Sequence, residues 1–117
     1  HLIEILLSNI INNSIKYTPA GGKILLRIFD KEENLCISIN DTGIGIPKDE
    51  LSKISVEFYR ASNAKSNRIE GTGLGLFVVK QIIENHNGIM RIESPSEIGD
   101  KESPGTEIEM EIPYIKI

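Results

Sequence analysis

The hydrophobic positions divide the chain into stretches with helical spacing and stretches with strand-like alternation. Residues 2–16 are rich in Ile and Leu, and their polar positions recur with helical spacing, which predicts one mostly buried helix with a polar stripe. A Pro and two Gly at 19–22 are expected to end it. Helical spacing returns at 74–86 and predicts a second helix that stops at Asn87 and Gly88. The expected buried face of this second helix comprises Leu76, Val79, Ile82 and Ile83.

Four other stretches are predicted to be strands, and the first two of them carry β-branched residues in partial alternation. The first two, 23–30 and 34–40, are joined by a charged turn and predict an antiparallel hairpin. The last two, 89–94 and 106–113, flank a loop at 95–105.

The middle of the chain predicts a short helix followed by a long loop. Pro47 suits the first turn of a helix that runs to about Ile54. Residues 57–70 are polar without a period, and the length of this loop favours a functional lid. The order of elements predicts an α/β (α+β) two-layer sandwich within one domain, residues 1–117. Its single mixed, mainly antiparallel sheet should carry about three helices on one face.

Composition and charge narrow the class of protein. A net charge of -4 and a pI near 5.2 argue against a nucleic-acid surface, which needs clustered Lys and Arg. No apolar run approaches a membrane span, so we expect no direct membrane contact. Cysteine usage indicates a reducing compartment, so we expect a cytoplasmic location. Cys36 is the only cysteine, which excludes an internal disulfide, and it is expected to be a small buried strand residue. The chain opens in helix-forming sequence without a starting Met, as a fragment of a longer polypeptide would.

Three polar side chains share one face of the first predicted helix. Asn9, Asn13 and Lys16 lie at i, i+4 and i+7. Each amide by itself is more often exposed or bonded to backbone. Together with the Lys, the pair can place a carbonyl oxygen on Mg²⁺ and an ammonium group on a phosphate. One such oxygen is chemically sufficient, because Mg²⁺ keeps several waters and takes few protein ligands.

Asp41 follows a predicted strand and precedes a turn with glycines at Gly43 and Gly45. A carboxylate only accepts hydrogen bonds, so it suits the exocyclic amino group of adenine, whereas guanine would present a carbonyl oxygen there. An Asp-Thr-Gly turn is common by itself. The same three letters also mark the catalytic loop of aspartic proteases, so a retroviral-type protease is a remote alternative. Those enzymes are nearly all β, and the asparagine-bearing helix would have no explanation.

A second glycine cluster, Gly71–Leu76, opens the second long helix. Glycines at a helix start expose backbone N–H groups, and the helix dipole favours a phosphate there. The spacing fits neither a dinucleotide fingerprint nor a Walker A loop. Combined with the asparagine-bearing helix and Asp41, the cluster predicts a site for a magnesium nucleotide.

In this order the motifs resemble the catalytic, ATP-binding (Bergerat-type) domain of bacterial two-component sensor histidine kinases. The asparagine box spans residues 9–19, and the first glycine box spans 41–45. Residues 58–60 (Phe-Tyr-Arg) resemble the phenylalanine box, Gly71–Leu76 the second glycine box, and 105–106 (Gly-Thr) the final one. The resemblance covers the whole chain.

The resemblance implies a role for each matching residue. It assigns Asn13 to Mg²⁺, Asp41 to adenine, Lys16 and Arg60 to phosphates, and Tyr17 to the wall of the adenine or ribose site. Residues 57–70 would form the mobile ATP lid. The remaining nucleotide-binding positions come from the glycine boxes: Gly43, Gly45, Gly71, Thr72, Gly73, Leu74, Gly75, Leu76 and Thr106.

The implied activity is a protein histidine kinase that moves the γ-phosphoryl group of Mg²⁺-ATP to a histidine on a separate dimerisation domain. The catalytic residues would be Asn9, Lys16 and Arg60. Asn9 stands where related ATPases carry a water-activating Glu, and an amide cannot take that proton, which fits transfer to histidine rather than to water. Neither His1 nor His86 has the context of the phosphorylated histidine.

The implied partners are the dimerisation and phosphoacceptor helical hairpin of the same kinase and, downstream, a response regulator. The isolated domain is expected to be a monomer, and the family allows a parent protein anchored in the cell membrane. Three features depart from the family: Ser14 replaces a usual Ala, Ser55 stands where a Phe often anchors the lid, and the loop 95–104 is longer than usual. Ser55 keeps open an alternative from another class, an ATP-binding signalling module without phosphoryl transfer.

Overall fold

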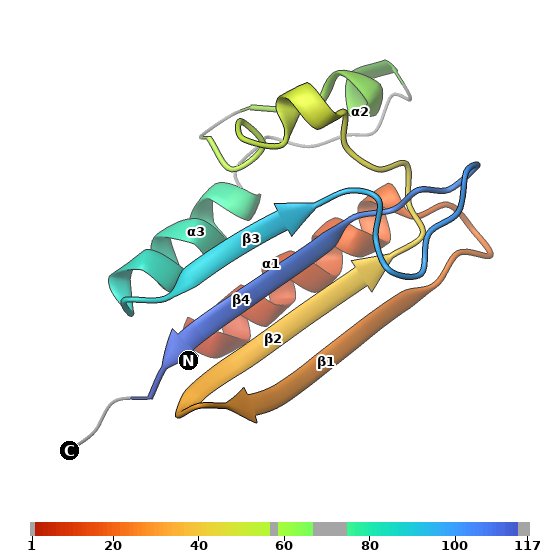
Figure 1. Cartoon of the computed structure of the whole chain (residues 1–117). Helices are drawn as coiled ribbons and strands as arrows, with labels where there is room; N and C mark the ends of the chain where they lie inside the picture. The colour runs from red at the N-terminus through yellow and green to blue at the C-terminus, as the bar shows by residue number, and fades with distance from the viewer. Residues whose placement is uncertain (1, 57–58, 67–74, 115–117) are drawn as a thin grey trace.

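A computed structural model describes residues 2–56, 59–66 and 75–114 of the chain. Its elements are α1 (Leu2–Tyr17), β1 (Ile24–Lys31), β2 (Asn34–Asp41), the 3₁₀ turn η1 (Lys48–Glu50), α2 (Ser62–Ser66), α3 (Gly75–Asn85), β3 (Ile89–Glu93) and β4 (Glu107–Pro113). The strands form one antiparallel sheet in the order β1-β2-β4-β3. Figure 1 shows α1 and α3 on one face of this sheet, with α2 beyond the end of β2 and the start of β4. The predicted two-layer α/β sandwich is therefore confirmed.

The predicted hairpin forms from β1 and β2, with Lys31 opposite Asn34. Glu32 and Glu33 make the turn with positive φ angles of 50° and 68°, a backbone twist that suits a tight hairpin. The position of β4 depends on longer-range pairing, because β4 lies between β2 and β3 rather than at the edge. This arrangement brings the end of β2 next to the start of β4, and Asn40 pairs with Glu107 there.

The core lies between the sheet and the two long helices. All four predicted residues of α3 are buried, as is Cys36 on β2. From the sheet, the largest fully buried side chains are Ile37, Ile39, Ile108 and Met110. Each of these side chains contributes roughly 1.5–3 kcal/mol when it leaves water.

The prediction that α1 is mostly buried is wrong. Only Leu6, Ile10 and Ser14 are buried, and Ile15 is 58% exposed. These three positions are spaced by four residues, so α1 packs through a single stripe against α3 and β2. The residues of β1 are likewise exposed along its whole length.

Two predictions for the middle of the chain also need correction. The helix expected from Pro47 to about Ile54 is only a 3₁₀ turn at 48–50, followed by further turns. Its N-cap has no side-chain hydrogen bond, and its bonds span three residues, as in Glu50 N to Pro47 O at 2.9 Å. Inside the expected loop 57–70, residues 62–66 form α2. The predictions for Glu57, for Phe58 and for residues 67–74, which include most of the second glycine box, lie outside the described residues.

Within the part of the chain that the structure describes, no helix combines the length and the apolar character needed to cross a membrane.

Candidate functional site

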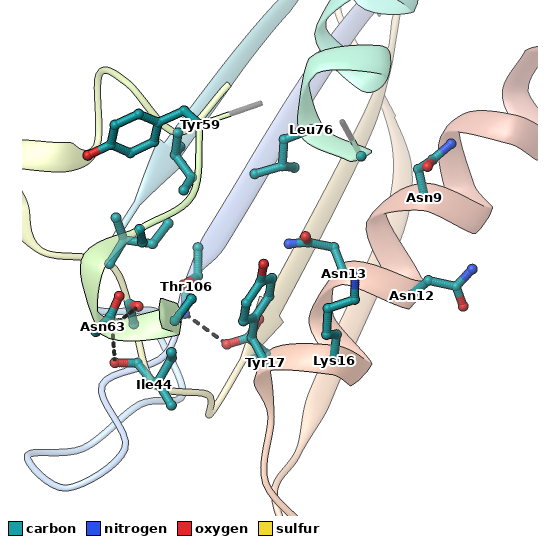
Figure 2. A pocket seen from close by; sticks show the side chains of 17 residues that line it. Asn9, Asn12, Asn13, Lys16, Tyr17, Ile44, Tyr59, Asn63, Leu76 and Thr106 are labelled. Carbon is teal, nitrogen blue, oxygen red and sulfur yellow. Dashed lines mark hydrogen bonds between the residues drawn. The ribbon is translucent and has the colours of Figure 1, made fainter. Parts of the chain in front are cut away.

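A pocket opens beside the C-terminal half of α1, between the start of α3, the segment around α2, the end of β2 and the start of β4 (Figure 2). The lining brings together side chains that are far apart in the sequence. The predicted site residues that line it are Asn9, Asn13, Lys16, Tyr17, Asp41, Gly45, Gly75, Leu76 and Thr106. The pocket therefore unites the asparagine box, the first glycine box, the end of the second glycine box and the final one.

α1 supplies the polar side of the pocket. Asn13, Lys16 and Tyr17 come from its last two turns, and Leu76 of α3 lies across from Asn13 (Figure 2). The amide nitrogen of Asn9 donates to the carbonyl of Ile5 at 2.8 Å, one turn back in the same helix. The Asn9 Oδ1 atom lies 3.9 Å from the place where a Cβ at Gly75 would sit, so it faces the start of α3.

Asp41 is 4% exposed and lies at the end of β2. Its Oδ1 atom accepts from the backbone N–H of Gly43 at 2.9 Å and from that of Thr106 at 3.0 Å. Two donors on one oxygen fix the plane of the carboxylate. Burial raises the pKa of Asp41, although the hydrogen bonds from Gly43, Thr106 and Ser14 act in the opposite direction. The site thus holds a buried, pre-oriented hydrogen-bond acceptor.

The turn after Asp41 can be this close to α1 only because position 43 is glycine. A Cβ at Gly43 would lie 2.4 Å from the backbone oxygen of Tyr17, which also accepts from Ile44 N at 3.2 Å. Gly43 was predicted to bind nucleotide, but the structure places it behind Asp41 rather than in the lining. Gly45, with φ of +75°, does line the pocket.

Glu50 ties the segment around α2 to the rest of the domain. It is 8% exposed and accepts from Tyr59 Oη at 2.5 Å, Ser62 Oγ at 2.6 Å and Ser62 N at 3.0 Å. The hydrogen bonds from Ser62 and then Tyr59 lower the pKa of Glu50. The carboxylate thereby holds the first residue of α2 and the Tyr59 side chain together.

Several lining residues were absent from the predicted site. Asn63 donates from Nδ2 to the carbonyl of Gly45 at 2.7 Å, so α2 is bonded directly to the glycine turn (Figure 2). No sequence signal could identify this contact, because its segment is polar and without a period. Arg60, predicted to bind phosphate, is half-buried between two lining residues, Tyr59 and Ala61, but does not itself line the described pocket. The other lining residues outside the predicted set are Asn12, Ile44, Ile46, Ile54 and Ala64.

The polar side chains of the pocket suit a hard cation whose other ligands come from bound phosphate groups. Among the described residues, no three His, Cys, Asp or Glu side chains gather in a metal-binding group. The pocket instead offers amide oxygens from Asn9 and Asn13 beside the ammonium group of Lys16. Mg²⁺ prefers oxygen ligands and is commonly shared between one protein side chain and phosphates, so these residues fit it.

An antiparallel sheet with helices on one face, an asparagine-bearing helix and a buried Asp before a glycine turn together define an ATP-binding domain of the Bergerat type. The chain belongs to this family, because the model of the histidine kinase-, DNA gyrase B- and HSP90-like ATPase family matches residues 1–116. The match and the α/β architecture exclude the aspartic protease alternative.

Relatives with similar sequences are sensor histidine kinases. The chain is 40% identical to the sensor histidine kinase WalK of Bacillus subtilis over 110 residues, which are 92% of this chain and 17% of that protein. It is 40% identical to the sensor histidine kinase RppB of Synechocystis sp. over 89 residues, 76% of this chain and 20% of that protein. The chain thus spans a fifth or less of the length of these relatives.

Solved structures of histidine kinases have the same fold. The mycobacterial sensor histidine kinase MprB matches with a TM-score of 0.81 and 31% identity, over 93% of this chain and 70% of that one. The catalytic domain of histidine kinase ThkA matches with a TM-score of 0.75 and 30% identity, over 96% and 67% of the two chains. In structure as well as in sequence, the chain is therefore similar to the catalytic domains of histidine kinases.

Proposed function

We propose that this chain binds Mg²⁺-ATP and passes the γ-phosphoryl group to a histidine on the dimerisation domain of a sensor histidine kinase. The observation that carries the proposal is the buried, pre-oriented carboxylate of Asp41 in the pocket. A carboxylate accepts but does not donate, so it pairs with the amino group of adenine and repels the carbonyl oxygen of guanine.

The phosphates would lie toward α1 and the start of α3. Asn13 would supply an oxygen ligand to Mg²⁺, and Lys16 would supply positive charge for the phosphates. The N-terminus of α3 at Gly75 adds the positive end of a helix dipole. Bound Mg²⁺ would neutralise charge on the transferring phosphoryl group. Asn9 lacks the basicity to activate water, which favours transfer over hydrolysis.

The rest of the proposal concerns motion and partners. Residues 57–70 would act as the ATP lid, with Arg60 reaching the phosphates when the lid closes. The phosphoacceptor hairpin of the same kinase would receive the phosphoryl group and hand it to a response regulator, in the cytoplasm. WalK and RppB are both named sensor histidine kinases, which supports this assignment.

Calorimetry with ATP and GTP in the presence of Mg²⁺ tests the base assignment. Asp41→Ala removes a hydrogen bond to a charged group, so ATP affinity should fall by about ten- to hundredfold, that is roughly 1.5–3 kcal/mol. Asp49→Ala removes an exposed carboxylate of η1 and is the matched control. Equal affinities for ATP and GTP in the unmodified chain would overturn the assignment of adenine to Asp41.

The metal role of Asn13 is tested by comparing binding in Mg²⁺ with binding in EDTA. Asn13→Ala should weaken the Mg²⁺ complex much more than the free nucleotide, because only the former uses the Asn13 oxygen. Asn12→Ala is the control, since Asn12 also borders the pocket but points away from Leu76 and Thr106 (Figure 2). Equal weakening in both conditions would make Asn13 a structural amide.

Phosphoryl transfer distinguishes a kinase from a module that only binds ATP. The isolated chain should hydrolyse ATP very slowly and should not label itself, whereas adding the phosphoacceptor hairpin as a separate polypeptide should give acid-labile phosphate. Transfer should be slow and concentration-dependent, because the covalent link is missing. Arg60→Ala should lower the transfer rate more than ATP affinity. Tight ATP binding without any transfer would favour the signalling module.

A further inference from the structure

The loop between β3 and β4, residues 94–106, lies directly behind the Asp41 turn. Ser94 Oγ donates to the carbonyl of Gly105 at 2.6 Å and accepts from Ile46 N at 3.1 Å. Gly105 N donates to the carbonyl of Gly43 at 3.0 Å. The loop is therefore bonded at several points to the turn that follows Asp41, although no motif in the loop predicts a role for it.

Ser96 makes the most direct of these contacts. It is 8% exposed, and its Oγ donates to the backbone carbonyl of Asp41 at 2.6 Å. The Asp41 amide donates to Thr106 O at 3.0 Å, and the carboxylate accepts from Thr106 N. Asp41 is thus held at its amide, its carbonyl and its side chain, and Ser96 supplies the hold on the carbonyl.

The position of Ser96 is itself fixed by hydrogen bonds within the loop and by hydrogen bonds from the loop to β2. Ser96 N donates to Pro104 O at 2.9 Å, and the next residue, Glu97, donates from its backbone to Asn40 Oδ1 at 3.0 Å. The Glu97 carboxylate pairs with Arg27 at 2.9 Å. Asn40 is fully buried beside Asp41. These contacts direct the Ser96 hydroxyl toward the carbonyl of Asp41.

We propose that Ser96 is a positioning residue for recognition of the nucleotide base by Asp41. This inference rests on the proposed binding of ATP. Without the hydroxyl, the buried Asp41 carbonyl loses its donor, and the peptide between Asp41 and Thr42 turns toward another one. That rotation moves the carboxylate, whose hydrogen bond to the base is directional. Ser96 acts through Asp41, because it lies outside the lining of the pocket.

The test compares Ser96→Ala with Ser103→Ala in the complete chain by calorimetry. Ser103 belongs to the same loop but contacts Asp100 through its backbone N–H, so its substitution keeps the loop bonded. Ser96→Ala should weaken Mg²⁺-ATP by about three- to tenfold and lower the preference for ATP over GTP, since one buried hydrogen bond is lost. Ser103→Ala should bind like the unmodified chain. Ser96→Thr keeps the hydroxyl and should restore most of the affinity.

The affinity for inorganic tripolyphosphate with Mg²⁺ distinguishes an effect on base recognition from a general structural effect of the substitution. Tripolyphosphate has no base, so its affinity should be the same in Ser96→Ala and the unmodified chain. ATP affinity that stays within twofold after Ser96→Ala, or equal losses for ATP and tripolyphosphate, would overturn the proposal. If Ser96→Ala does not fold, Ser96→Cys, whose thiol is a weak donor, replaces it in the same comparison. Asp41→Ala, measured alongside, distinguishes failure of the Ser96 proposal from failure of the proposed base-binding role of Asp41. If Asp41→Ala leaves ATP affinity unchanged, the assignment of adenine to Asp41 is itself wrong.

Discussion

Replacing Gly105 with Ala should destabilise the domain more than a change of backbone preference can explain. Gly105 has φ of +72°, and a Cβ there would lie 1.8 Å from the Asp41 carbonyl oxygen and 2.7 Å from Ser96 Oγ. The left-handed backbone conformation alone disfavours Ala by about 1–2 kcal/mol. The overlap must also displace the Asp41 carbonyl from Ser96, and an unsatisfied buried acceptor costs about 1–3 kcal/mol more.

Gly21 offers a matched control for this substitution. It has φ of +85°, but a Cβ there would meet nothing within 4 Å. Gly21→Ala should therefore show the backbone effect alone, about 1–2 kcal/mol. The loss of unfolding free energy in Gly105→Ala beyond that in Gly21→Ala measures how much the contact between the β3–β4 loop and Asp41 stabilises the domain.

Urea unfolding followed by circular dichroism provides the measurement. With a urea m-value of roughly 1–3 kcal/mol/M, an excess of about 2 kcal/mol moves the midpoint by roughly 1 M. Gly105→Ala should also weaken ATP binding, while Gly21→Ala should leave it unchanged. Equal midpoints for the two variants would contradict this prediction, because the close approach of Gly105 to Asp41 would then have no effect on stability.

Two further predictions concern the titration of carboxylates. Because burial raises the pKa of Asp41 above its ordinary 3.8, ATP affinity measured by calorimetry should fall as pH is lowered through the raised value, by up to about tenfold per pH unit. Asp41→Asn should abolish this slope, and a slope that persists would assign it to another group. The folding stability of the nucleotide-free domain depends on pH in the opposite direction. The folded state binds the extra proton, so the contribution of Asp41 to stability declines as pH rises from 3.8 through the folded pKa. For Glu50, whose pKa is lowered below 4.5, the contribution is present above that value and is lost as pH falls through the folded pKa. Glu50→Gln should speed amide exchange at Ser62 severalfold near neutral pH, and unchanged exchange there would show that the charge is unimportant for α2.

The local elements and the chemistry of the motifs can be predicted from the amino-acid sequence without knowledge of the fold. The apolar positions of α3 predicted its buried face, since helical periodicity depends only on neighbours along the chain. The spacing of Asn9, Asn13 and Lys16 likewise placed these side chains on the pocket side of α1. Asp41 before a glycine turn indicated a base-binding acceptor before any fold was known. Each of these signals is carried within one element or one turn.

How much of α1 is buried cannot be predicted in this way, because burial depends on which elements cover each face of the helix rather than on periodicity. The tertiary structure also places Asn63 and Tyr59 in the pocket, through hydrogen bonds to Gly45 and Glu50 that no local pattern encodes. The role of Ser96 has the same origin. Ser96 is 55 residues from Asp41 in the sequence, and the two meet only because β4 lies beside β2 and returns the β3–β4 loop to the end of that strand.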